Sequence, residues 1–299
     1  VTPMRVPFLD LRTLNAPLVN DYLSAYRSTI EKCDFILGEN VTKFERSFAA
    51  WVNNAECATC ANGTDAITLA ALALEIPKNS EALVPANTYY ATVSALLQAG
   101  VRVKLVDVTQ DTWLLDTALL QSLITDRTRL IVPVHLYGQM CPMDEIKKMA
   151  ETKNLFVLED AAQAHGATWK GQHVGHWGDI ASYSFYPGKN LGCFGDGGAV
   201  VSQRKDVIDK IRYLRNHGSL KKYEHESVGF NSRLDTTQAD VLNIKLAHMD
   251  RWNERRREIA RAYREMLGSI DGLTLPYEHP DAKHVYHLYV VQVDDRDAF

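Results

Sequence analysis

The chain has 299 residues, enough for one large α/β domain or for one and a half domains. Hydrophobic residues make up 46% of it and charged residues 23%, as in ordinary globular proteins. The net charge of -4 argues against a nucleic-acid partner, and because no stretch approaches the ~20 apolar residues of a membrane span, no membrane association is expected.

From about residue 41, short runs rich in valine, leucine and isoleucine alternate with longer stretches of helical periodicity. Strands are predicted at residues 56–60, 81–85, 101–107, 129–134 and 154–159. Helices are predicted between them at residues 64–74, 90–99, 117–124 and 143–153. This alternation predicts an α/β fold with a mostly parallel sheet between helices. Two further strands, at 180–185 and 198–202, lack a long helix between them, so part of the sheet is expected to be antiparallel.

The pattern changes beyond residue 236. Residues 236–267 are predicted to form one long, arginine-rich helix of the kind that bridges two domains, and residues 284–293 a strand. One strand cannot form a stable second domain. We therefore expect a large cofactor-binding domain over residues 1–250 and, over 251–299, the start of a smaller α+β domain that looks incomplete.

Five cysteines in 299 residues argue against a disulfide framework and favour a reducing cytoplasm. Cys57 and Cys60 have the spacing of a redox or metal pair, but no second such pair follows, so buried cysteines flanking a strand are the better interpretation. His165, His173 and His176 have no acidic residue at metal-binding spacing. No metal site is expected.

Lys189 carries the clearest chemical signal, because it lies in a loop with proline and glycine downstream of a strand that ends at Asp160. A lysine amine forms a Schiff base with the aldehyde of pyridoxal phosphate, and a carboxylate pairs with the pyridinium nitrogen so that the ring accepts electrons. A loop lysine is usually only a solvated charge, and a lone aspartate at a strand end is more often a helix cap. Together at one sheet edge they predict a pyridoxal-phosphate enzyme.

Other residues along the chain suit the same cofactor. Gly63 and Thr64 lie between a strand and a helix, where free amides and a hydroxyl form a phosphate cradle, although ordinary N-capping explains them equally well. Tyr89 lies at the next strand-to-helix turn and offers a flat face to the ring, with core packing as the alternative. Ser184 is placed to donate to the phosphate and Gln163 to the 3-hydroxyl.

Taken together, these residues resemble the DegT/DnrJ/StrS sugar aminotransferases, pyridoxal-phosphate enzymes of fold type I. The matching segments run along nearly the whole chain, at residues 6–11, 36–38, 44–45, 62–66, 85–89, 134–139, 159–163, 184–189, 229–235 and 238–239. So many matches in order are specific for the family and less so for the substrate.

The resemblance implies a role for each position. Lys189 is the Schiff-base lysine and proton shuttle, Asp160 the pyridinium partner, Gln163 the contact to the 3-hydroxyl, Tyr89 the stacking ring, and Gly63, Thr64 and Ser184 the phosphate ligands.

The resemblance also implies that Asn231 reaches the cofactor phosphate of the neighbouring subunit, which requires a homodimer with shared active sites. Arg233 is expected to contact anionic groups of the substrate. His135, His165 and His217 are candidate substrate contacts, but a hydrogen-bonded structural histidine fits each at least as well.

The implied reaction moves an amino group from glutamate to a keto group on a nucleotide-linked deoxysugar. Segments 7–11, 85–89 and 286–289 favour C3 of a dTDP-3-keto-6-deoxyhexose over C4. A sugar dehydratase of the same family is an alternative, and because such enzymes can replace the lysine by histidine, Lys189 counts against it. A non-catalytic regulator is a further alternative, although no DNA-binding helical module is recognisable. The sequence leaves the sugar, the nucleotide and the pathway open.

Overall fold

The computed structural model describes residues 6–53, 56–219, 224 and 227–298. Its centre is a seven-stranded sheet in the order β1-β9-β8-β5-β4-β2-β3. The strands are β1 (Glu56–Cys60), β2 (Glu81–Pro85), β3 (Arg102–Val106), β4 (Thr128–Ile131), β5 (Phe156–Asp160), β8 (Ile180–Ser184) and β9 (Gly198–Ser202). Only β9 runs against its neighbours, pairing antiparallel with β8 and with β1. The predicted mixed, mostly parallel sheet is thus confirmed.

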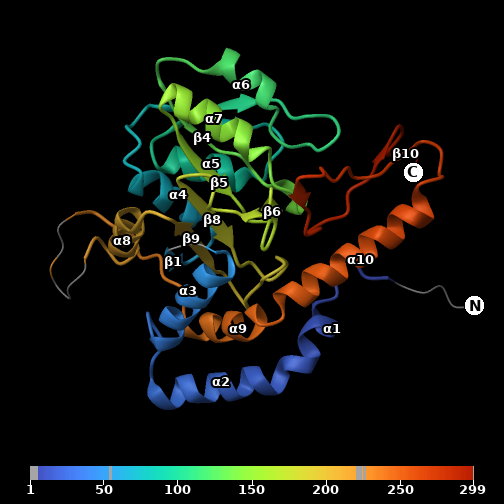
Figure 1. Ribbon diagram of the computed structural model, residues 1–299. Helices are drawn as coiled ribbons and strands as arrows, with labels where there is room; N and C mark the ends of the chain where they lie inside the picture. Colours follow the sequence, from blue (N-terminus) through green and yellow to red (C-terminus); the bar gives the residue numbers. More distant parts are fainter. Residues whose placement is uncertain (1–5, 54–55, 220–223, 225–226, 299) are drawn as a thin grey trace, which may run out of the picture.

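Helices cover both faces of this sheet (Figure 1). They are α3 (Glu39–Trp51), α4 (Gly63–Ala73), α5 (Tyr90–Gln98), α6 (Thr117–Leu123), α7 (Met143–Lys153), α8 (Lys205–Leu214) and α9 (Thr236–Leu246). Apolar side chains of α4, α5 and α8 form the core on one face, and those of α3, α6, α7 and α9 form the core on the other.

The cysteines follow this two-sided packing. Because side chains alternate along a strand, Cys57 packs into the core on the α3 side and Cys60 into the core on the α4 side. The pair therefore cannot act as a redox or metal pair without refolding β1. All five cysteines are free, and Cys33 is exposed whereas the other four are buried.

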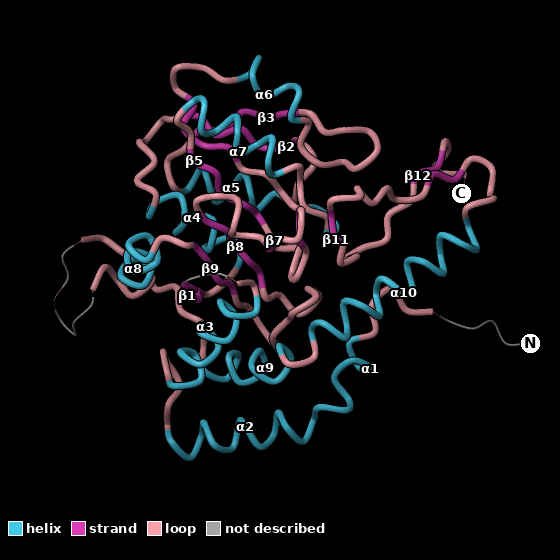
Figure 2. The backbone as a smooth tube through the Cα atoms, in the orientation of Figure 1, coloured by secondary structure: helices cyan, strands magenta, loops and turns pink. Residues whose placement is uncertain are grey.

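An N-terminal layer packs beneath this body. It consists of α1 (Leu11–Asn15), η1 (Ala16–Leu18) and α2 (Val19–Lys32). Helix α2 runs alongside α9, as Figure 2 shows, and the two are joined by a 2.7 Å hydrogen bond from Thr29 Oγ1 to Asp240 Oδ2. None of the helices in the described residues is long and apolar enough to cross a membrane.

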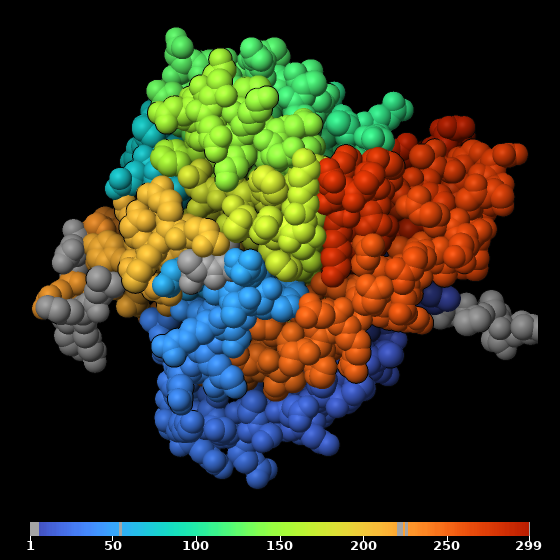
Figure 3. All heavy atoms as spheres, viewed as in Figure 1, coloured from blue at the N-terminus to red at the C-terminus, as the bar shows by residue number. Residues whose placement is uncertain are grey.

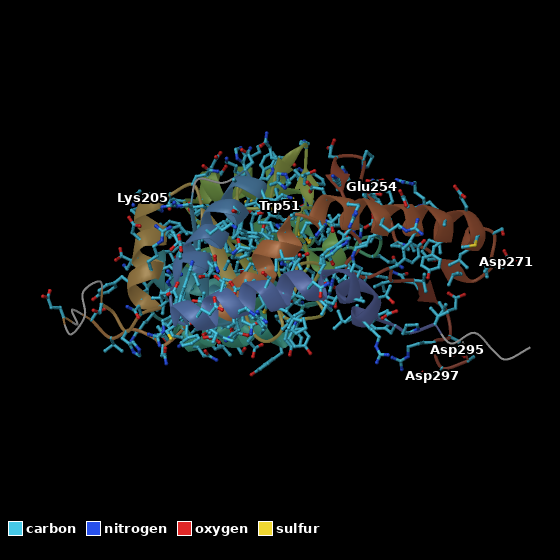
Figure 4. The ribbon with its side chains drawn as sticks, turned by 90° about the horizontal axis from the view of Figure 1, so that it is seen from below. Trp51, Lys205, Glu254, Asp271, Asp295 and Asp297 are labelled. Carbon is cyan, nitrogen blue, oxygen red and sulfur yellow. The ribbon has the colours of Figure 1, made fainter. Side chains whose placement is uncertain are left out.

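The prediction of one helix over residues 236–267 was wrong, because the chain forms α9 and then a separate helix, α10 (Met249–Leu267). The last turn of α9 tightens where the His248 amide bonds to the Lys245 carbonyl at 2.9 Å, three residues back. After this break α10 projects away from the sheet, and Figure 4 shows Asp271, Asp295 and Asp297 at that far end of the molecule.

The predicted strand over residues 284–293 was also wrong. Within this range only β12 (Gln292–Val293) is a strand, and it pairs with β10 (Leu273–Thr274). Just before the range, β11 (Ala282–Lys283) pairs with β6 (Thr168–Trp169), which also pairs with β7 (Gln172–His173). Tyr286 interrupts any longer strand because its φ is 44°, a left-handed conformation. The division into domains at residue 250 stays a prediction.

Candidate active site

A pocket of about 780 Å³ opens where β5 and β8 end and α4 begins. Its lining includes seven residues predicted from the sequence to hold the cofactor, namely Gly63, Thr64, Tyr89, Asp160, Gln163, Ser184 and Lys189. The carboxyl ends of parallel strands are the usual place for a ligand in an α/β sheet. The structure therefore brings together residues that lie far apart in the chain.

The first turn of α4 forms one end of the pocket. Asn62 caps the helix, with its Oδ1 accepting from the Asp65 amide at 2.8 Å. Gly63 allows this turn to approach β8, because a Cβ there would lie 2.6 Å from Cβ of Ser184. Amides at a helix N-terminus together with the hydroxyls of Thr64 and Ser184 suit a phosphate group.

This phosphate end has few positive charges. Of the described residues that line the pocket, Lys189 is the one cation, whereas Asp65, Asp160 and Asp196 are carboxylates. Ser232 Oγ donates to Asp65 Oδ2 at 2.6 Å, so the segment that carries Asn231 runs close to this end of the pocket.

Asp160 is the last residue of β5 and is only 5% exposed. Both of its carboxylate oxygens accept hydrogen bonds, Oδ2 from Thr92 Oγ1 at 2.7 Å and Oδ1 from the Ala162 amide at 3.1 Å. The orientation of the carboxylate is therefore determined by α5 and by the turn after β5. A fixed, buried carboxylate is what a protonated pyridine nitrogen requires.

Lys189 lies in the loop between β8 and β9, where its amide bonds to the Tyr186 carbonyl at 2.9 Å. Burial lowers the pKa of Lys189, and the nearby Asp160 carboxylate opposes that shift. A lowered pKa leaves more of the amine unprotonated near neutral pH, which a nucleophilic lysine needs. Gln163 lies across the pocket, and its Oε1 accepts from the Tyr137 amide at 2.7 Å, so its amide N–H groups remain as donors.

The other predicted site residues do not line this pocket. His135 is buried in the core, where Nε2 lies 2.8 Å from Glu159 Oε2 and Nδ1 accepts from the Cys141 amide at 3.2 Å. His165 is buried against the rings of Tyr183 and Phe185. The hydrogen bonds of His135 favour the structural alternative for that residue. Neither ring nitrogen of His165 has a hydrogen-bond partner among the described residues, so its role as a substrate contact stays a prediction.

The remaining three predicted residues lie on the segments that flank residues 220–226. His217 and Asn231 are exposed, and Arg233 Nη1 donates to Asn216 Oδ1 at 3.1 Å. Their predicted contacts with substrate, or with a partner's cofactor, stay predictions.

Two kinds of site residue were missed. Thr92, which orients Asp160, carries no signal in the sequence beyond its place one turn after Tyr89. His287 and Asn190 bond to each other beside Lys189. In the sequence, segment 286–289 indicated only a preference for a 3-keto sugar, and no role in the site was predicted for His287 or Asn190. No group of three histidine, cysteine or acidic side chains within the described ranges is placed to bind a metal ion.

Comparison with known proteins decides the family. The sequence profile of the DegT/DnrJ/EryC1/StrS aminotransferase family matches residues 18–299. The chain belongs to this family. The predicted fold type I architecture, the aminotransferase activity and the pyridoxal-phosphate cofactor are thereby confirmed, and the residues of the pocket fit that cofactor.

Individual relatives are similar over almost all of the chain. The dTDP-3-amino-3,6-dideoxy-alpha-D-galactopyranose transaminase of Aneurinibacillus thermoaerophilus is 45% identical, over 98% of this chain and 81% of the relative. The dTDP-3-amino-3,4,6-trideoxy-alpha-D-glucose transaminase of Streptomyces venezuelae is 42% identical, over 98% of this chain and 77% of the relative. The crystal structure of S. venezuelae DesV with a ketimine intermediate superposes with a TM-score of 0.97, at 42% identity, covering 99% of this chain and 80% of that one.

Proposed function

We propose that this aminotransferase moves an amino group from glutamate to C3 of a nucleotide-linked keto-deoxysugar, a dTDP-3-keto-6-deoxyhexose. The observation that carries the proposal is the pocket in which Lys189, Asp160 and Gln163 converge, in a chain 42–45% identical to two transaminases named for 3-amino sugars. The retained Lys189 argues against the sugar dehydratase alternative. It argues equally against a non-catalytic regulator, which would have no use for a half-buried lysine beside a buried, oriented acid.

The chain's own residues divide the work. The amides of the first turn of α4, with Thr64 and Ser184, bind the phosphate, and Asp160 holds the protonated ring nitrogen. When bound, pyridoxal phosphate supplies an electron-accepting ring that stabilises the negative charge left by proton removal. Lys189 Nζ would move the proton between the substrate carbon and the cofactor, a task for which its lowered pKa prepares it.

We also propose a cytoplasmic homodimer with two shared active sites. A phosphate dianion and a nucleotide diphosphate need cations, and Lys189 is the single one among the described lining residues. Tyr89 at the pocket mouth is 75% exposed, and Tyr90 and Tyr186 near it are exposed as well, as expected of apolar surface that a second copy covers. Asn231 and Arg233 are the residues we expect the second copy to contribute. Five free cysteines suit a reducing compartment.

A substrate panel tests the reaction. Purified protein, pyridoxal phosphate and glutamate are incubated with dTDP-linked 3-keto and 4-keto deoxysugars, and the products are identified by mass spectrometry. The Lys189→Ala variant is the control for uncatalysed amination. Amination of the 3-keto sugars supports the proposal, and amination of 4-keto sugars alone would overturn the C3 assignment while leaving the family assignment intact.

A further inference from the structure

Asn190, the residue after Lys189, connects the lysine loop to two other parts of the chain. It is 3% exposed, and its Nδ2 donates both to Asn253 Oδ1 on α10 at 3.1 Å and to the Val285 carbonyl at 3.2 Å. Asn253 Nδ2 donates in turn to the His165 carbonyl at 2.8 Å. Because carbonyl oxygens only accept, these bonds determine which way both amides point, and Asn190 Oδ1 is left as an acceptor.

This acceptor determines the tautomer of His287. The Nδ1 atom of His287 lies 3.1 Å from Asn190 Oδ1, which has no hydrogen, so Nδ1 must be the donor. Burial, with smaller effects from Lys189 and Arg256, lowers the pKa of His287 to about 3. The ring is therefore neutral near pH 7, with its proton on Nδ1 and a lone pair on Nε2.

The segment that carries His287 also contacts residues 137–138. We call residues 285–288 the site strap. The Val285 amide donates to the Gly138 carbonyl at 2.9 Å and the Leu288 amide to the Tyr137 carbonyl at 3.3 Å. Tyr137 is the residue whose amide orients Gln163. Figure 3 shows the C-terminal residues, in red, packed against the yellow-green part of the molecule.

We infer that His287 is a positioning residue of the active site, which holds the Lys189 loop against the site strap through Asn190 and so places the lysine relative to Gln163. The inference deepens the proposed function, because it rests on Lys189 being the cofactor lysine. It assigns a structural task in the site to a segment near the C-terminus of the chain.

The first test measures the tautomer directly. In protein labelled with ¹⁵N at histidine, the imidazole nitrogen shifts of His287 at pH 7 should be those of a neutral ring protonated on Nδ1. The His287→Asn variant identifies the signal by its loss. A ring protonated on Nε2, or a charged imidazolium, would overturn the inference whatever the enzyme's substrate proves to be.

The second test measures the lysine rather than turnover. Cofactor-free protein is reductively methylated in short pulses across a pH series, and the pH midpoint for modification of Lys189 is read by peptide mass spectrometry. Among the described residues, the charged or titratable groups that interact with this lysine are Asp160 from β5, His165 from the turn after it and His287 itself, and Arg256 from α10 acts on the two histidines. Only the last is changed.

In His287→Ala the midpoint should move upward, because a released loop admits water and burial is what lowers the pKa of Lys189. His287→Asn should restore the wild-type midpoint, because an amide N–H can occupy the place of Nδ1. A matched comparison is His284→Ala, which removes another buried imidazole, one that stacks on Tyr286 of the strap and accepts from its amide at 2.9 Å. Because His284 does not bond to Asn190, this variant should move the midpoint less than His287→Ala does.

Equal midpoints in the wild-type, alanine and asparagine proteins would overturn the inference. Should His287→Ala fail to fold, the Lys189 midpoint in His287→Asn and the ¹⁵N measurement of the His287 tautomer still test the inference. Failure of the proposed function would instead appear as cofactor attached to a different lysine, a result that leaves the tautomer and the midpoint measurements unaffected.

Discussion

Thr92 Oγ1 donates a 2.7 Å hydrogen bond to Oδ2 of Asp160, so a residue of α5 orients the acid that β5 brings to the pocket. Thr88 Oγ1 lies 2.8 Å from the same Thr92 hydroxyl and extends the chain of polar contacts toward the pocket. The side chain of Asp160, at the end of β5, is thus oriented by α5, an element that lies beside it only in the folded protein.

Asp160→Asn should lower turnover by about a hundredfold or more, because a preorganised charge of this kind is typically worth several kcal/mol in the transition state. Thr92→Val should cost less, roughly tenfold, since it removes one hydrogen bond to a charged group and leaves the charge. Both variants should still bind the cofactor, which its visible absorbance reports. Near-normal turnover in Asp160→Asn would mean that another group holds the ring nitrogen.

Borohydride reduction of the cofactor-loaded protein should attach the cofactor covalently to Lys189. Lys245 is a useful internal comparison because it is more deeply buried than Lys189, at 2% exposure, but lies in α9 and bonds to the Gly192 carbonyl at 2.7 Å. Peptide mapping should find the label on Lys189 and none on Lys245. Label on any other lysine would refute the assignment of the site.

Mixing two inactive variants tests whether sites are shared. One parent is Lys189→Ala and the other is Asn231→Ala, chosen for weakened cofactor binding. If Asn231 serves the partner's site, mixed dimers contain one site with both defects and one with neither, and activity returns in part. No recovery, despite proven subunit exchange, would place Asn231 in its own subunit's site or outside any site.

Stability should depend on a buried ion pair that does not line the cofactor pocket. Arg215 Nη1 lies 2.5 Å from Glu45 Oε1, and both side chains are 8% exposed. Arg215→Met leaves the carboxylate buried without its cation and should lower the free energy of unfolding by about 3–5 kcal/mol. The exposed pair of Lys205 and Asp209 provides the control, because Lys205→Met should change urea unfolding little.

The buried amine of Lys245 should give stability a measurable pH dependence. Burial lowers its pKa from 10.5 to about 8. Below pH 8 both states hold the proton and the folded protein carries the full cost of the buried charge. Between about pH 8 and 10.5 only the unfolded chain holds it, so stability rises with pH. The unfolding free energy of the wild type minus that of Lys245→Met should therefore rise from pH 7.5 to 9.5, and a constant value would contradict the lowered pKa.

The helices and strands that could be predicted are those determined by the pattern of apolar and polar residues within a short stretch of sequence. The alternation of apolar runs with helical stretches is a property of neighbouring residues, and so is the capped turn at Gly63. The pairing of Asp160 with Lys189 could be predicted because both follow strands that end at one edge. The left-handed backbone of Tyr286 could not be predicted, since the flanking residues Val285 and Leu288 bond to residues 137–138, which only the folded chain brings near. Thr92 and His287 were missed because each acts through a partner that only the tertiary fold supplies.

The distribution of the cysteines has a practical consequence. Since Cys33 alone among the five thiols is exposed, a maleimide fluorophore should attach at one defined position, the C-terminal end of α2. That helix packs on α9, which precedes the helix that carries Asn253. A dye there would report slow association or dissociation of subunits by polarisation, without any engineered residue.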